Sequence, residues 1–172
     1  MKTMLITLSM LLISVAGKSQ DKKKGAEIIV HDKQIHEIIP ADAEIEVLGT
    51  GFEWTEGPLW LPSEEKLIFS DIPKNSIFEW TEKEGIKLYL KPSGYTGNEK
   101  RGGEAGSNGL LLSPEGDLVL CMHGDRRVAR MVAPVSNPEP EFETLVGRYN
   151  GKKLNSPNDA TYNSQGELYF TD

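Results

Sequence analysis

The sequence has little cysteine, little histidine and no basic face, and each shortage removes a class of function. Cys121 is the only cysteine among 172 residues, which excludes an internal disulfide, and we interpret it as a small buried hydrophobic side chain. The three histidines, His31, His36 and His123, lack the spacing of a zinc site. Lysine and arginine are scattered among more numerous acidic residues, and the net charge of −7 predicts no nucleic-acid partner.

Long amphipathic helices and nucleotide-binding loops are also missing. The glycine-rich stretch 93–109 has neither a following Lys-Ser/Thr pair nor a strand-to-helix context, so it supports no P-loop and no dinucleotide fingerprint. We expect it to be a long loop that shapes substrate entry. The rest of the chain contains short apolar runs between clusters of Gly, Pro, Asn and Ser, and these runs predict a nearly all-β fold. They are AEIEVLG, KLIFSD, SIFEW, IKLYL, DLVLCM, RVARMV and ELYFTD.

The beginning of the chain resembles a leader rather than a domain. Residues 1–20 contain one lysine, an apolar run over 4–16 and small residues after it, a pattern typical of a secretory signal peptide and too short for a membrane span. We therefore expect a secreted or periplasmic protein without a membrane span. Residues 21–43 are polar and predict a flexible lead-in, and the main domain is expected over residues 44–172.

The most informative pattern is an internal repeat. EGPLWLPSEEKLIFSD, NGLLLSPEGDLVLCM and NDATYNSQGELYFTD each contain a polar residue, a short strand, a tight turn and a second apolar strand. They begin at Glu56, Asn108 and Asn158, so the period is about 50 residues. Such a period with several strands per unit is typical of β-propeller blades, and a β-sandwich with similar hairpins is the alternative.

In a propeller, equivalent positions of successive blades lie on a ring around one axis, so Glu56, Asn108 and Asn158 are predicted to converge. Oxygen groups of this kind suit a hard cation, Ca²⁺ first. Without a partner, these buried oxygens in a shared channel would lower the stability of the fold. For Glu56 taken alone, the alternative is a carboxylate at a strand end in a surface ion pair.

Several motifs together resemble one known family. EGPLW, LIFSDIPKNSIFEW, SNGLLLSPEGDLVLCMHGDRRVARM and GKKLNSPNDATYNSQGELYFTD follow one another as in the gluconolactonase/SMP-30/luciferin-regenerating-enzyme family, from about Gly51 to the last residue. The resemblance implies a six-bladed β-propeller of the calcium-dependent phosphotriesterase-like type, with one divalent cation on its axis. Ca²⁺ is expected, with Mg²⁺, Mn²⁺ and Zn²⁺ as alternatives.

The resemblance also implies residue roles. Glu56 and Asn158 fall on positions that hold the metal, although the position of Asn158 contacts the water or substrate beside the metal in some members. Asn108 and His123 match positions at the substrate pocket, and a purely structural histidine is the alternative for His123. Arg101, with Lys100 beside it, could bind a sugar acid, against the alternative of a solvated loop charge.

At about 50 residues per blade, six blades need many more residues than this chain has. We therefore expect about the first half of a propeller, a truncated piece that is inactive alone, whose general base, an Asp, lies beyond Asp172. The full-length protein is expected to be a carboxylic-ester hydrolase acting on a sugar lactone. Another lactone or phosphotriester hydrolase on the same fold and a non-catalytic binding propeller are the alternatives, and the oligomeric state stays open.

Overall fold

The computed structural model describes residues 26–172, and the predicted signal peptide lies outside the described residues. By its internal contacts the chain divides into two units, and the boundary in the sequence lies between Val47 and Leu48. The two units are described separately. In the first unit, a short 3₁₀ helix, η1 (Lys33–Glu37), begins where the Asp32 carboxylate accepts a hydrogen bond from the Gln34 N–H at 2.9 Å. Residues 26–172 contain no helix long and apolar enough to cross a bilayer.

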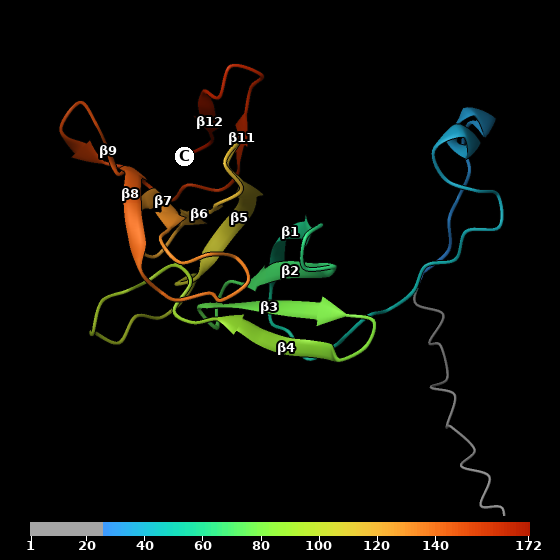
Figure 1. The fold of residues 1–172 in the computed structure, drawn as a ribbon, viewed down its shortest axis with the longest axis horizontal. Helices are drawn as coiled ribbons and strands as arrows, with labels where there is room; N and C mark the ends of the chain where they lie inside the picture. The colour runs from blue at the N-terminus through green and yellow to red at the C-terminus, as the bar shows by residue number, and fades with distance from the viewer. Residues whose placement is uncertain (1–25) are drawn as a thin grey trace, which may run out of the picture. The chain divides into compact units, whose positions relative to one another are not determined.

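The second unit is built from antiparallel sheets of consecutive strands (Figure 1). The first sheet contains β1 (Thr55–Leu61), β2 (Lys66–Asp71), β3 (Ser76–Thr81) and β4 (Gly85–Leu90) in chain order. The second repeats this order with β5 (Ser107–Leu112), β6 (Leu118–Met122), β7 (Arg127–Met131) and β8 (Phe142–Val146). Two small hairpins follow, β9 (Arg148–Tyr149) with β10 (Lys152–Lys153), and β11 (Ala160–Tyr162) with β12 (Leu168–Phe170).

The tight turns of the three repeated hairpins share one feature of backbone geometry. Glu65, Gly116 and Gly166 occupy equivalent positions in the turns β1–β2, β5–β6 and β11–β12, and all three have positive φ. Two of the three are glycine because this conformation carries no steric cost without a Cβ. The predicted repeat of hairpins is therefore confirmed by strand pairing and by turn conformation.

The sheets are stacked face against face, and the second sheet is buried on both sides. One of its faces shares a core with the first sheet that includes Leu61, Ile68, Leu120 and Met131. Its other face packs Val119, Cys121 and Val128 against side chains of β11 and β12. A sheet of a two-layer sandwich has one exposed face, whereas a propeller blade is covered on both faces by its neighbours. This burial confirms the predicted partial propeller over the sandwich alternative.

One predicted strand is wrong, and three strands, β8, β9 and β10, were missed. The run AEIEVLG, residues 43–49, forms no strand, although its alternating pattern predicted one. The fourth strand of the second blade, β8, was not predicted, because three of its five residues are exposed and polar residues break its apolar run.

Candidate functional site at the strand starts

The three polar residues of the repeat lie at equivalent places in three hairpins. Glu56 and Asn108 are each the second residue of the first strand of a blade, and Asn158 lies two residues before β11. The Asn158 N–H donates to the Thr171 carbonyl at 3.0 Å, which joins it to the end of its own hairpin. The hairpin register thus places each of them where its blade begins.

Glycine brings these strand starts into contact. A Cβ on Gly57 would lie 2.4 Å from the carbonyl oxygen of Asn108, and a Cβ on Gly109 would lie 2.9 Å from that of Asn158. Both distances are too short for a real Cβ, so any side chain there would force the strands apart. The backbones of the residues that follow Glu56 and Asn108 therefore touch the next blade.

Hydrogen bonds join the same neighbours. The Gly109 N–H donates to the Asn158 carbonyl at 2.7 Å, and the buried Ser70 hydroxyl donates to the Asn108 carbonyl at 3.0 Å. The backbone carbonyls are thus used between blades, which fixes the strand starts side by side and leaves the side chains to define the site. Whether Glu56 and Asn158 bind a metal stays a prediction.

The side-chain oxygens of Glu56 and Asn158 have few partners. Glu56 is exposed, and its Oε1 accepts a hydrogen bond from the Trp54 indole N–H at 3.2 Å. None of the ion pairs among residues 26–172 includes Glu56, contrary to the alternative of a surface ion pair. Asn158 is exposed, and its side-chain amide has no hydrogen-bond partner among the same residues.

These two side chains fit a hard cation in their chemistry, since a carboxylate and an amide oxygen are ligands that Ca²⁺ accepts. They do not complete a site. Within the described part of the chain, no group of three His, Cys, Asp or Glu side chains could hold a metal ion. Further oxygen ligands are required, and Ca²⁺ takes six to eight.

Two aspartates that sequence reasoning left without a role hold the loops that lead into the site. The buried Asp71 carboxylate accepts hydrogen bonds from the N–H groups of Glu53 and Trp54, at 3.2 and 3.2 Å, and pairs with Lys74 at 2.9 Å. In the third hairpin, the Asp172 carboxylate accepts from Asn155 and Ser156 at 2.8 Å each.

The two aspartates act at matching positions. In each case the donors lie three and two residues before the polar residue, Glu56 or Asn158. The shared endings FSD and FTD were a visible signal for this role. Met122 occupies the equivalent position in the second blade, so the loop before Asn108 has no such carboxylate.

Asn108 and His123, the predicted pocket residues, are brought together by the second blade. Asn108 is almost fully buried, and its Nδ2 lies 3.5 Å from His123 Nδ1. The same Nδ1 lies 3.2 Å from the carboxylate of Glu104, a residue of the long loop that sequence reasoning did not select. His123 therefore connects the loop to the buried amide.

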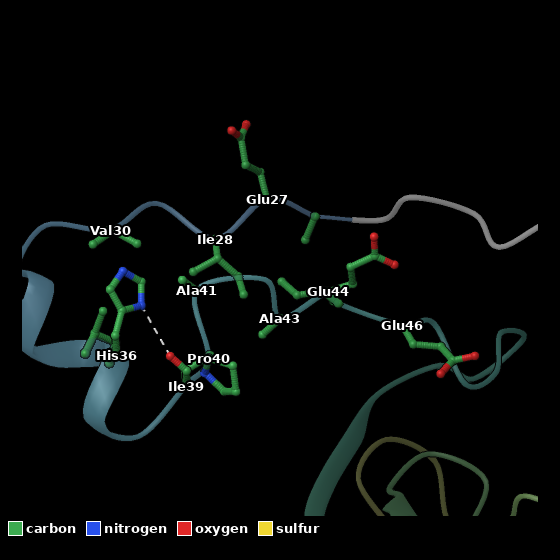
Figure 2. A pocket seen from close by; sticks show the side chains of 13 residues that line it. Glu27, Ile28, Val30, His36, Ile39, Pro40, Ala41, Ala43, Glu44 and Glu46 are labelled. Carbon is green, nitrogen blue, oxygen red and sulfur yellow. Dashed lines mark hydrogen bonds between the residues drawn. The ribbon is translucent and has the colours of Figure 1, made fainter.

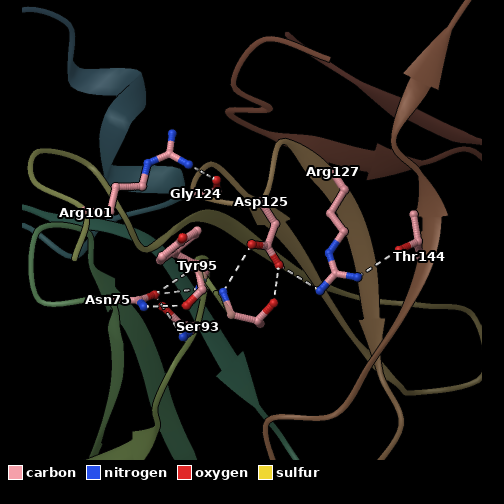
Figure 3. A network of polar contacts seen from close by, with 10 residues as sticks. Asn75, Ser93, Tyr95, Arg101, Gly124, Asp125, Arg127 and Thr144 are labelled. Atoms are coloured by element: carbon pink, nitrogen blue, oxygen red, sulfur yellow. Dashed lines mark hydrogen bonds and ion pairs between the residues drawn. The ribbon is translucent and has the colours of Figure 1, made fainter. Parts of the chain in front are cut away.

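Arg101 is in contact with the protein rather than free in its loop (Figure 3). Its guanidinium donates to the Gly124 carbonyl and lies 5.4 Å from the ring centroid of Tyr95. Lys100 beside it is exposed. Substrate binding by Arg101 stays a prediction, and these contacts would hold the guanidinium in place.

The long loop that carries Arg101 and Glu104 is fixed at its base by two polar side chains (Figure 3). Asn75 Oδ1 accepts from the backbone N–H groups of Ser93, Gly94 and Tyr95. Asp125 accepts from the Thr96 N–H and hydroxyl, at 3.1 and 2.7 Å. The predicted loop is therefore anchored on the turns after β2 and β6.

Cys121 lies in the core between the second blade and the third hairpin. Burial, together with the nearby charge of Asp159, raises the pKa of its thiol to about 12. A thiol with such a high pKa is not a nucleophile at neutral pH. The prediction of a buried hydrophobic side chain is confirmed.

The first unit contains a hollow of its own (Figure 2). Residues 26–46 line it with aliphatic side chains, three glutamates and His36, whose Nδ1 lies 3.3 Å from the Ile39 carbonyl oxygen. None of the predicted site residues lines this hollow.

Known proteins are similar to this chain in both sequence and fold. A gluconolactonase of Zymomonas mobilis is 32% identical over 167 residues, which cover 92% of this chain and 46% of that protein. The structure of a gluconolactonase from Xanthomonas campestris superposes with a TM-score of 0.67 at 30% identity, over 84% of this chain and 42% of the other. The X-ray structure of another protein, assigned as a gluconolactonase within its protein family, superposes with a TM-score of 0.67 at 33% identity. The match covers 81% of this chain and 43% of the other.

The chain spans less than half the length of these relatives. The family model described as the SMP-30/Gluconolactonase/LRE-like region matches residues 54–172, which include both four-stranded blades and the third hairpin. Because this match covers well over half of the chain, the chain belongs to the SMP-30/Gluconolactonase/LRE-like family.

Proposed function

We propose that the full-length protein hydrolyses a sugar lactone at the strand starts, with a divalent cation held in part by Glu56 and Asn158. The observation that carries the proposal is the pair of exposed, largely unpartnered oxygen side chains at equivalent strand starts in a chain of this family. Two relatives named gluconolactonases, each at least 30% identical, support the choice of substrate class. Ca²⁺ is the cation that we propose first.

Such a cation supplies Lewis-acid polarisation of the lactone carbonyl. The chain's own residues would do the rest of the binding. Asn108 offers an amide that is almost fully buried, where a hydrogen bond to a substrate oxygen is stronger than in water. Trp54 holds one oxygen of Glu56 through its indole N–H and so limits the rotation of that carboxylate. The general base is expected beyond Asp172.

The predicted signal peptide adds a location to this proposal. A leader over residues 1–20 would place the enzyme outside the cytoplasm, secreted or periplasmic, where its substrate would be an extracellular sugar lactone. Fusion of residues 1–20 to a reporter enzyme would test this location. Reporter retained in the cytoplasm would contradict it.

The test of the activity uses the full-length protein, a panel of aldonolactones, other lactones and phosphotriesters, and two variants. Glu56→Gln keeps the size of the side chain but removes its charge, so we expect kcat/KM for the best lactone to fall by about a hundredfold or more. Glu53→Gln is the matched control, because Glu53 is exposed on the same segment and its side chain has no hydrogen-bond partner in residues 26–172. We expect it to keep wild-type activity.

Each outcome has a defined meaning. Faster hydrolysis of phosphotriesters than of lactones would mean that the substrate is a phosphotriester, while the assignment of the site would stand. A Glu56→Gln variant with full activity would show that the site is wrong. No turnover of any ester by the folded wild-type protein would favour a binding propeller.

A further inference from the structure

We infer that Glu104 is a positioning residue that keeps a proton on His123 Nδ1 and thereby frees the side-chain NH₂ of Asn108 to donate to the substrate. The inference rests on the proposed function for the identity of that substrate, a sugar lactone. It concerns residues of the second blade and its loop, and it requires no metal.

The two contacts of His123 Nδ1 compete. The nitrogen lies 3.2 Å from Glu104 Oε2 and 3.5 Å from Asn108 Nδ2. A ring nitrogen either carries a hydrogen and donates, or carries a lone pair and accepts. The Glu104 carboxylate only accepts and the Asn108 NH₂ only donates, so Nδ1 can serve one of them at a time.

The shorter contact and the chemistry of the carboxylate favour Glu104. A hydrogen bond to a charged acceptor is stronger than one between neutral groups, and 3.5 Å is at the limit for the competing bond. With the hydrogen on Nδ1, the two hydrogens of Asn108 Nδ2 have no acceptor on the ring. They are then available to an oxygen of the substrate.

Burial makes this choice consequential. Asn108 is 4% exposed, so leaving its amide group without a hydrogen-bond partner costs free energy. A substrate oxygen that accepts from this amide removes that cost, and this favours binding. Without Glu104, Nδ1 could accept from the Asn108 NH₂ instead. One of the two amide hydrogens would then be used inside the protein, so Asn108 would have one hydrogen fewer to donate to an oxygen of the lactone.

The loop geometry supports a defined place for Glu104. Its loop is fixed at the base by Asn75 and Asp125 and further along by Arg101, which donates to the Gly124 carbonyl next to His123. Within residues 26–172, Nε2 of His123 has no hydrogen-bond partner, so nothing else described there fixes the tautomer. Glu104 is thus the group that selects it.

The first measurement is the tautomer itself, read from the ¹⁵N chemical shifts of His123 in the full-length protein at mildly alkaline pH, where free histidine is neutral. We expect the wild-type ring to carry its hydrogen on Nδ1 and the Glu104→Ala ring to shift towards the Nε2 form. Glu99→Ala is the matched control, an exposed glutamate of the same loop without a polar partner among the described residues. A wild-type ring with its hydrogen on Nε2, or no shift in Glu104→Ala, would overturn the inference.

The second measurement asks whether Glu104 acts through Asn108. We expect Glu104→Ala to raise KM for the lactone about tenfold, the equivalent of one lost hydrogen bond, with a smaller change in kcat. In an Asn108→Ala background, the same change should have almost no further effect. Additive losses would overturn the coupling. If the wild-type protein hydrolyses no lactone, the proposed function fails while the chemical shifts still decide the tautomer.

Discussion

Gly57 offers the sharpest test of how the strand starts meet. Gly57→Ala adds one methyl group at a residue whose φ is +55°, in a position where that carbon would lie 2.4 Å from the Asn108 carbonyl oxygen and 2.9 Å from the Leu110 nitrogen. Gly85→Ala is the matched control. Its φ of +67° is similar, but no atom lies within 4 Å of the added carbon.

The two changes share one cost and differ in another. Both place an L residue in the left-handed conformation, which costs about 1 kcal/mol. Gly57→Ala also overpacks backbone against backbone, which adds about 1–3 kcal/mol. We therefore expect the free energy of unfolding to fall by about 2–4 kcal/mol for Gly57→Ala and by about 1 kcal/mol for Gly85→Ala.

Urea unfolding of the full-length protein, followed by circular dichroism, measures both values. Because Gly57 follows Glu56 directly, Gly57→Ala should also lower lactone hydrolysis, whereas Gly85→Ala should not. Equal losses of stability in the two variants would refute the reasoning, since they would mean that β1 and β5 do not approach each other at this point.

Two further predictions concern buried groups. Asp71→Ala removes the acceptor of the Glu53 and Trp54 N–H groups and the ion-pair partner of Lys74, so urea unfolding should show a loss of about 2–3 kcal/mol, and a loss below about 0.5 kcal/mol would contradict the anchoring role. Burial raises the pKa of the Cys121 thiol from 9.0 to about 12, so its contribution to stability is complete below pH 9 and is lost as the pH rises towards 12. Cys121→Ala should therefore lose less stability than wild type between pH 7 and about pH 10.5 in urea unfolding, and an unchanged pH dependence would show that the thiol does not titrate in this way.

The repeat predicted most of the fold because it records a constraint that every blade shares. Each hairpin needs two apolar strands and a turn residue with positive φ, and both features are visible in the sequence around Gly116 and Gly166. The run at residues 43–49 has an equally good pattern and forms no strand, because a strand also needs a hydrogen-bonded partner, which the pattern of one segment cannot supply.

The candidate site was predictable only in part, for a similar reason. Glu56, Asn108 and Asn158 are marked by the repeat, whereas Glu104 is marked by nothing local: it lies in an irregular loop and reaches His123 through the folding of that loop. The charge of Arg101 made it a candidate for substrate binding, and its guanidinium contacts Gly124 and Tyr95. Asp71 and Asp172 were predictable in part: the sequence shows that the same residue ends both hairpins, but only the structure shows that its carboxylate anchors the preceding loop.

Removal and return of the cation would test the central claim most directly. Gluconolactone hydrolysis by the full-length protein is measured after chelation of divalent cations and during stepwise return of Ca²⁺, in wild type and in Glu56→Gln. We predict that chelation abolishes hydrolysis, that Ca²⁺ restores it in the wild type, and that Glu56→Gln responds only weakly. Hydrolysis that survives complete chelation, or full restoration in Glu56→Gln, would contradict a cation site at Glu56.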